Sequence, residues 1–157
     1  MPSTPRVIAR AGVAVALAAG VVAGAGVAPA QAAVSQSYLN AYEVRVVKAI
    51  NAQRVSHHLK PLSYTSCPDR YAERLATQLR TKSTLTHQAL LPIMKACSAN
   101  RASENIARAN LPARSLVALW MRSPGHRANI LDPKVNQIGV GTQCASQCTT
   151  VTDFIRR

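Results

Sequence analysis

The sequence predicts an α+β fold, because helical patterns dominate its middle part and strand patterns fill its last quarter. Apolar residues recur at steps of three and four over residues 38–50 and 71–79, which is the spacing of amphipathic helices. Residues 137–142 and 149–154 instead alternate from one residue to the next, as strands do. The chain has 157 residues, a length that suits one domain.

Helices are expected in four places. The first begins behind a serine cap, Ser35 or Ser37, and ends near Arg54. The second opens at residues 66–69, where Ser-Cys-Pro-Asp resembles a capping box with Asp at its third helical position. A third, short helix covers residues 88–96 and is tolerable if its proline lies in the first turn.

The fourth helix and a hairpin complete the expected elements. Residues 115–121 predict a helix with Trp120 in the core, and the Ser-Pro-Gly sequence at 123–125 is expected to break it. The two alternating segments that follow are joined by a short polar loop, which indicates an antiparallel hairpin. That loop carries Cys144 and Cys148.

The N-terminal segment is typical of a secretory signal peptide. Arg6 and Arg10 precede an uncharged run over residues 11–28, and Ala30-Gln31-Ala32 supplies an A-x-A cleavage site. A membrane anchor is the alternative, but the run is rich in Ala and Gly and no basic cluster follows it. We therefore expect a signal peptide at 1–32 and one secreted domain at 33–157, without a stable membrane span after cleavage.

Four cysteines, Cys67, Cys97, Cys144 and Cys148, all follow the expected cleavage site. Outside the cell, four cysteines allow three pairings. No C-x-x-C pair exists and no histidine has zinc-finger spacing, so a structural zinc site is disfavoured. We favour Cys67–Cys97, which would close a long loop, and Cys144–Cys148, which would staple a turn.

The chain is strongly basic, with 19 Lys and Arg against 6 Asp and Glu and a formal net charge of +13. Loss of Arg6 and Arg10 with the signal would leave +11. Such a charge favours an anionic cell-envelope polymer or lipid as partner, although solubility alone would also explain it. The basic residues are scattered and no nucleic-acid motif occurs, so we expect no nucleic-acid partner. We also expect the protein to be a monomer.

Several motifs occur in a fixed order along the chain: Asn51-Ala52-Gln53-Arg54, Thr86-His87, Ser103-Glu104-Asn105-Ile106-Ala107, Trp120-Met121-Arg122-Ser123-Pro124-Gly125-His126-Arg127-Ala128-Asn129-Ile130-Leu131 and Ile138-Gly139-Val140-Gly141. In this order the set resembles the CAP superfamily, and in particular its bacterial SCP-like branch. The superfamily includes cysteine-rich secretory, antigen 5 and pathogenesis-related class 1 proteins. The resemblance covers residues 40–155 and implies a three-layer α-β-α sandwich with a central antiparallel sheet.

The resemblance also implies a cleft that holds two histidines and acidic partners. Carried over by position, these residues are His87, Glu104 and His126. Many family members have a second glutamate three residues after the tryptophan, but this chain has Ser123 there. Ser103 replaces the glycine that usually precedes the first glutamate.

Two imidazoles are suitable ligands for a divalent metal such as zinc, and we take His87 and His126 as the candidate pair. Two protein ligands would leave positions for water, and Glu104 could orient an imidazole or hold a metal-bound water. A hydrogen-bonded network without metal is the alternative. No catalytic residue is assigned, because nothing in the sequence places Ser123 beside a base.

Two functions are compatible with this cleft. The first is a non-enzymatic binding module for an envelope, lipid-like or peptide ligand, with His87, Glu104, His126 and Ser123 lining the cleft. The second is a metal-dependent hydrolase that acts on extracellular polymers. The missing second carboxylate favours binding over catalysis.

Other polar residues have structural explanations. We expect His57 and His58 to be solvated in a polar connector, and Asn51 and Asn129 to bond backbone groups near turns.

Overall fold

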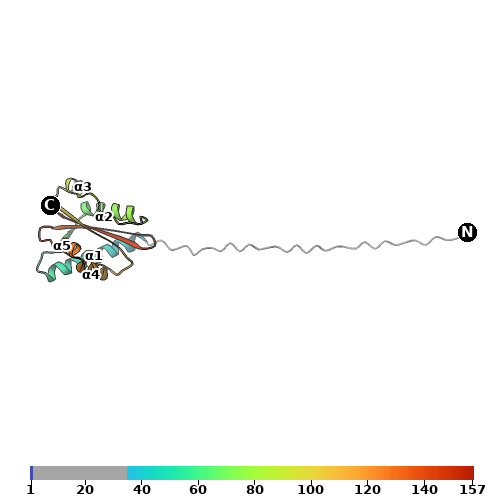
Figure 1. Ribbon diagram of the computed structural model, residues 1–157, viewed down its shortest axis with the longest axis horizontal. Helices are drawn as coiled ribbons and strands as arrows, with labels where there is room; N and C mark the ends of the chain where they lie inside the picture. The colour runs from blue at the N-terminus through green and yellow to red at the C-terminus, as the bar shows by residue number, and fades with distance from the viewer. Residues whose placement is uncertain (2–34) are drawn as a thin grey trace. The chain divides into compact units, whose positions relative to one another are not determined.

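A computed structural model of the chain describes Met1 and residues 35–157, so the predicted signal peptide lies almost wholly outside the described residues. Helices lie on both sides of a four-stranded sheet (Figure 1). The elements are α1 (Gln36–Ser56), β1 (Ser63–Tyr64), α2 (Ser66–Leu79), α3 (Leu90–Ala96), β2 (Arg101–Arg108), α4 (Ala113–Arg122), α5 (Pro124–Ile130), β3 (Gln137–Cys144) and β4 (Cys148–Arg156). Among the described residues, no helix is long and apolar enough to cross a membrane.

The sheet has the order β1-β3-β4-β2. The predicted hairpin is β3 and β4, which pair antiparallel from Gln137 to the Cys144–Cys148 turn. β2 pairs antiparallel with the other edge of β4, so the three long strands are antiparallel as expected. β1 adds only two residues, which run parallel to β3, so the complete sheet is mixed.

Three layers result, with α2 and α3 on one face of the sheet and α1, α4 and α5 on the other (Figure 1). The larger core lies under α1, α4 and α5, where Trp120 is fully buried against both helices and strands. On the opposite face, α2 packs on Ile106 and Val151. Alternation of side chains along each strand supplies apolar groups to both faces.

The Gly-Val-Gly sequence of β3 sets how closely α2 lies on the sheet. A Cβ atom at Gly139 would collide with the backbone of Asp69, and one at Gly141 with the backbone of Glu73. Only glycine therefore allows the α2 backbone to rest directly on β3.

The ends of α1 lie close to where the sequence predicts them, and two polar residues of this helix, Asn51 and Arg54, bond backbone groups of other segments. Ser35 is the N-cap, and its hydroxyl accepts the Tyr38 N–H. Asn51 bonds both backbone groups of Leu62, at 2.8 and 2.9 Å. The buried Arg54 guanidinium donates to three backbone carbonyls, those of Lys60, Ile130 and Asp132, and so ties α1 to the segment after α5.

Several predicted boundaries were wrong. α2 is capped at Thr65, so the 66–69 sequence is not a capping box, because the Asp69 carboxylate bonds Tyr64 and Val140 instead. α3 begins at Leu90 rather than residue 88, and its proline lies in the first turn. After the expected break at Ser123, a further helix, α5, begins with proline at its first position, where no N–H is needed.

Both disulfides join the pairs that the sequence favoured. Cys67 at the start of α2 is bonded to Cys97 at the end of α3, with their Cα atoms 5.7 Å apart. Cys144 and Cys148 close the β3–β4 turn. The first bridge fixes the ends of the segment that carries His87.

Candidate functional site

The centre of the site is Glu104, a carboxylate on the edge strand β2 that is almost completely buried. Its Oε1 atom lies 2.6 Å from His87 Nδ1, and its Oε2 atom accepts a 2.6 Å bond from the Gln88 side-chain amide. The Gln88 backbone N–H also approaches Oε1, at 3.4 Å. The irregular segment before α3 is therefore held to β2 through this one side chain.

A second acidic group lies beside the first. Glu104 and Asp153 are direct cross-strand partners in the β2–β4 pair, so their side chains share one face of the sheet. The Gln88 amide also reaches the two Asp153 carboxyl oxygens, at 3.1 and 3.4 Å. Its bonds to both acids make Gln88 a bridge between them.

Burial and the neighbouring Glu104 raise the pKa of Asp153 to about 8, although the bond from Gln88 acts in the opposite direction. At neutral pH the protonated form of Asp153 is therefore favoured. Two carboxyl groups this close in a buried place cannot both ionise easily. The site thus keeps one proton on its acidic pair.

His87 lies between this buried network and solvent. Its side chain is 63% exposed, whereas that of Glu104 is 2% exposed. With Glu104 as a carboxylate acceptor, the His87 proton belongs on Nδ1, and Nε2 becomes the nitrogen available to a ligand. Glu104 therefore fixes both the orientation and the tautomer of the imidazole.

His126 belongs to the short helix α5, which two asparagines tie to β2. The Asn105 amide donates to the His126 carbonyl, and the Asn129 amide donates to the Glu104 carbonyl. The His126 ring lies 6.4 Å from the Trp120 ring, centroid to centroid. Burial, followed by the nearby charge of His87, lowers the pKa of His126, so its imidazole is neutral at pH 7. The two histidines are thus within electrostatic reach of each other.

Ser123 occupies a different kind of position. It precedes α5, its backbone carbonyl accepts the Arg127 N–H, and its side chain caps no helical N–H. Within residues 35–157, no hydrogen bond joins its hydroxyl to His87, Glu104 or His126. Ser103 is also notable, because its buried hydroxyl lacks a bonding partner among the described residues.

The remaining histidines stay apart from the site. Both His57 and His58 are exposed, as expected, but His57 is not merely solvated. Its Nδ1 lies 2.8 Å from the Gln53 carbonyl and its Nε2 lies 3.2 Å from an Arg127 nitrogen. These contacts brace the end of α1.

Gln88 and Asp153 belong to the site but were not predicted from the sequence. The sequence pattern indicates Gln88 only as the start of a helix and Asp153 only as part of a strand. The register of the hairpin alone does not pair Asp153 with Glu104, because that contact needs β2. A strand was not expected at residues 101–108, whose sequence is mostly polar.

A three-layer fold with a histidine and carboxylate network at one sheet edge defines a CAP-type domain. The model of the CAP family, described as the cysteine-rich secretory protein family, matches residues 47–154. The chain belongs to this family.

Individual relatives agree with this assignment. The uncharacterized protein YkwD of Bacillus subtilis is 36% identical over 112 residues, a match that covers 67% of this chain and 44% of that protein. An outer surface protein of Borrelia burgdorferi has a TM-score of 0.65 at 22% identity, over 71% of this chain and 90% of that one. An extracellular SCP-domain protein of Bacillus anthracis also has a TM-score of 0.65, at 21% identity, over 79% of this chain and 44% of that one.

Proposed function

We propose that this protein is a secreted, non-enzymatic binding module whose cleft of His87, Glu104 and His126 holds a polar envelope ligand of the peptide or glycan class. The observation that most supports this proposal is that the exposed His87 imidazole is fixed on the buried Glu104 by a 2.6 Å bond. A binding site needs polar groups held in one orientation, because ordering them during binding would reduce affinity.

The state of the two imidazoles supports a ligand with hydroxyl or amide groups. His87 offers Nε2 as an acceptor once Nδ1 donates to Glu104. His126 is neutral at pH 7, because burial lowers its pKa. A neutral His126 imidazole bonds hydroxyl and N–H groups well but attracts a charged headgroup only weakly, so a lipid-like ligand is less suited to this cleft.

Secretion is part of the proposal. The chain belongs to a family described as secretory, and its described cysteines are all in disulfides, which persist in oxidising compartments. Cleavage after Ala32 would release the domain that carries the site. N-terminal sequencing of protein from culture supernatant tests this step, and an intact Met1 on a membrane fraction would contradict it.

NMR spectra of the histidine rings test the cleft directly. Soluble peptidoglycan fragments, N-acetylglucosamine oligomers and short peptides are the probes. We expect a bound probe to shift the ring signals of His87 and His126, and we expect His87→Asn or His126→Asn to weaken its binding at least about tenfold, the loss of one well-formed hydrogen bond in a pocket.

His58→Asn is the matched control for these variants. His58 is exposed and has a left-handed backbone, with φ of 59°, which asparagine tolerates. This variant should bind as the wild type does. Equal losses in all three variants, or ring shifts confined to His57 and His58, would contradict the proposed cleft.

The alternative function for the same cleft is that of a metal-dependent hydrolase, and an experiment must distinguish the two. Within the described residues, no three His, Cys, Asp or Glu side chains form a group that could hold a metal ion. His87 and His126 could supply two imidazoles, while Glu104 is already bonded to His87. Calorimetric titration with zinc decides between the two: micromolar binding that both His→Asn variants abolish would favour the hydrolase.

A further inference from the structure

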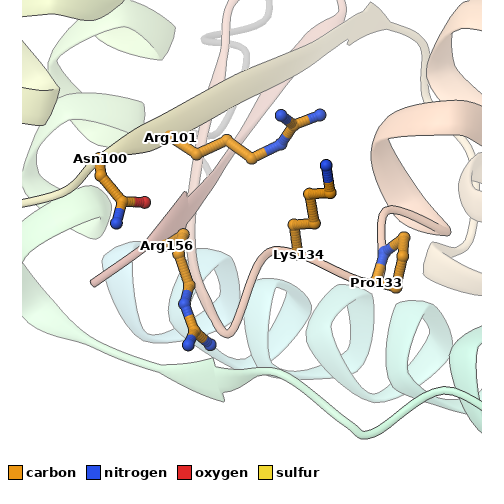
Figure 2. A pocket seen from close by; sticks show the side chains of 5 residues that line it. All are labelled: Asn100, Arg101, Pro133, Lys134 and Arg156. Carbon is orange, nitrogen blue, oxygen red and sulfur yellow. The ribbon is translucent and has the colours of Figure 1, made fainter.

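We propose that a basic pocket on the other face of the sheet is a second binding site, and that it takes the oxyanion groups of a linear envelope polyanion. The pocket is a hollow of about 430 Å³. It is lined by Asn100, Arg101, Pro133, Lys134 and Arg156 (Figure 2). This inference goes beyond the proposed cleft, because none of these residues takes part in the His87 network.

The strand register separates the basic pocket from the acidic network of Glu104 and Asp153. Arg101 and Glu104 are three residues apart on β2, so their side chains point to opposite faces of the sheet. Their cross-strand partners, Arg156 and Asp153, are separated in the same way. The acidic network therefore faces the α2 and α3 layer, and the basic pocket faces the layer that includes α5.

The pocket contains a charge arrangement that an anion would stabilise. Arg101 and Arg156 are direct cross-strand partners, and like charges in such positions repel each other. Asp132 accepts a 2.5 Å bond from Arg101 Nε and neutralises one of the three cations. Within residues 35–157, no side-chain bond or salt bridge occupies the Lys134 ammonium or the Arg156 guanidinium.

The three cations form two positions rather than one. Figure 2 shows the Lys134 ammonium and the Arg101 guanidinium pointing toward each other, whereas the Arg156 guanidinium points away from both. A single small anion would engage the first position only. Successive oxyanion groups along a polymer could engage the two positions together, which raises the effective concentration of the second group.

Backbone bonds hold the pocket in shape. The Asn100 N–H donates to the Arg156 carbonyl at 2.9 Å, and the Lys134 N–H donates to the Asp132 carboxylate at 2.9 Å. The turn before Asn100 is fixed by Ser98, which has a left-handed backbone with φ of 51°, and by the disulfide at Cys97. Rigid placement lowers the entropy lost when a ligand binds.

The composition of the lining favours a polymer over a bilayer or a nucleic acid. No large apolar side chain lines the pocket, so nothing there would insert among acyl chains. No aromatic side chain lines it either, and single-stranded nucleic acids are held largely by stacking on aromatic rings. Polymers with phosphate or carboxylate groups can form charged hydrogen bonds with Arg and Lys, and they need neither apolar insertion nor aromatic stacking.

The test compares two double variants that remove the same charge. Lys134→Gln with Arg156→Gln empties the pocket of two cations but keeps the Arg101–Asp132 bond. Lys48→Gln with Arg114→Gln removes two exposed cations from α1 and α4 that do not line the pocket. Affinity for poly(glycerol phosphate) and for polygalacturonate is measured by calorimetry at low and moderate salt, with phosphatidylglycerol vesicles as a third probe.

We expect the pocket variant to bind at least one polymer about tenfold more weakly, and the control variant to change less than about threefold. The polymer that shows the pocket-dependent loss identifies the group as phosphate or carboxylate. Equal losses in both double variants would mean diffuse attraction and would overturn the inference, as would pocket-dependent binding to vesicles alone. His87→Asn should leave polymer affinity unchanged, and a loss there would assign the polymer to the cleft instead.

Discussion

Two largely buried carboxyl pairs lie at opposite edges of the same sheet, and they have different partners. The site pair, Glu104 and Asp153, is on the β2 side and bonds the side chains of His87 and Gln88. The core pair, Glu43 and Glu73, is on the β3 side, where Glu43 accepts the Thr142 backbone N–H at 2.7 Å.

The partners explain what each pair does. β1 covers only the start of β3, and beyond it the N–H groups of Thr142 and Val140 are taken by the carboxylates of Glu43 and Asp69. The core pair therefore satisfies an exposed strand edge, which is a structural task. The site pair instead holds an exposed imidazole. Burial of a carboxyl group is thus no guide to function by itself, whereas the identity and exposure of its partners are.

Both pairs also hold a proton at neutral pH, for the same reason. Burial and Glu73 raise the pKa of Glu43 to about 9, as burial and Glu104 raise the pKa of Asp153 to about 8. The two pairs are therefore alike in their raised pKa values but differ in their hydrogen-bond partners. Mutations can test these two properties separately.

The largest effect is expected from Gly141→Ala, which affects the core pair alone. A Cβ there would collide with the backbone of Glu73 and push α2 off β3. Because two backbones cannot repack as side chains do, we expect a loss of at least about 3 kcal/mol in the free energy of unfolding. Urea denaturation followed by circular dichroism measures it.

Gly125→Ala is the control for that change. Gly125 is in α5 and a Cβ there meets nothing within 4 Å, so alanine should be neutral or slightly stabilising. If Gly141→Ala were equally harmless, the close approach of α2 to β3 would not be what encloses the core pair.

The second prediction concerns pH and involves both pairs. Unfolded carboxyl groups are ionised above about pH 5, whereas folded Asp153 and Glu43 keep their protons to about pH 8 and 9. The folded state therefore binds more protons in this range, and the free energy of unfolding should fall as pH rises from 7 to 9.5, by up to about 4 kcal/mol. His126, whose pKa is lowered, changes stability only below this window.

Two isosteric variants show which carboxyl group causes which part of this pH dependence of stability. Asp153→Asn should remove its lower part and Glu43→Gln its upper part, because an amide cannot ionise. Stability is measured by urea denaturation at half-unit pH steps. Curves that stay parallel to the wild-type curve would show that neither group holds a proton in the folded protein.

The sequence predicted the outer frame of the molecule better than its site. Helix patterns with strong apolar periodicity and the β3–β4 hairpin were placed correctly, because burial imposes those patterns on the chain. β2 was missed, since its arginines, Glu104 and Asn105 interrupt the alternation that identifies a strand. Glu104 and Asn105 also belong to the candidate site, so the strand signal was weakest in the segment that carries this site.

The site residues also divide into those that the sequence could indicate and those that it could not. His87, Glu104 and His126 could be nominated from the motif resemblance, which carries positions but not contacts. Gln88 and Asp153 could not, because their roles depend on the β2–β4 register and on a segment without regular structure. A residue that bridges two strands through its side chain leaves no periodic trace in a sequence.

The smallest effect is expected from replacing the glutamine whose side chain bonds each carboxyl pair. Gln88 bonds both acids of the site pair, at 2.6 and 3.1 Å, whereas Gln143 bonds only Glu73 of the core pair, at 3.2 Å. Bonds to charged, buried acceptors contribute more than single half-exposed ones, so Gln88→Ala should cost about 2 kcal/mol and Gln143→Ala less than about 1 kcal/mol.

The two glutamine variants should also differ in titration, which separates a role in the site from a packing role. The Gln88 bond lowers the pKa of Asp153, so its loss should raise that pKa further, while Gln143→Ala should leave it unchanged. NMR titration of the Asp153 carboxyl carbon measures the shift, with the exposed Gln78→Ala as control. A stability loss without this shift would mean that Gln88 only anchors the His87 segment, and that the proton of the site pair is held by burial and Glu104 alone.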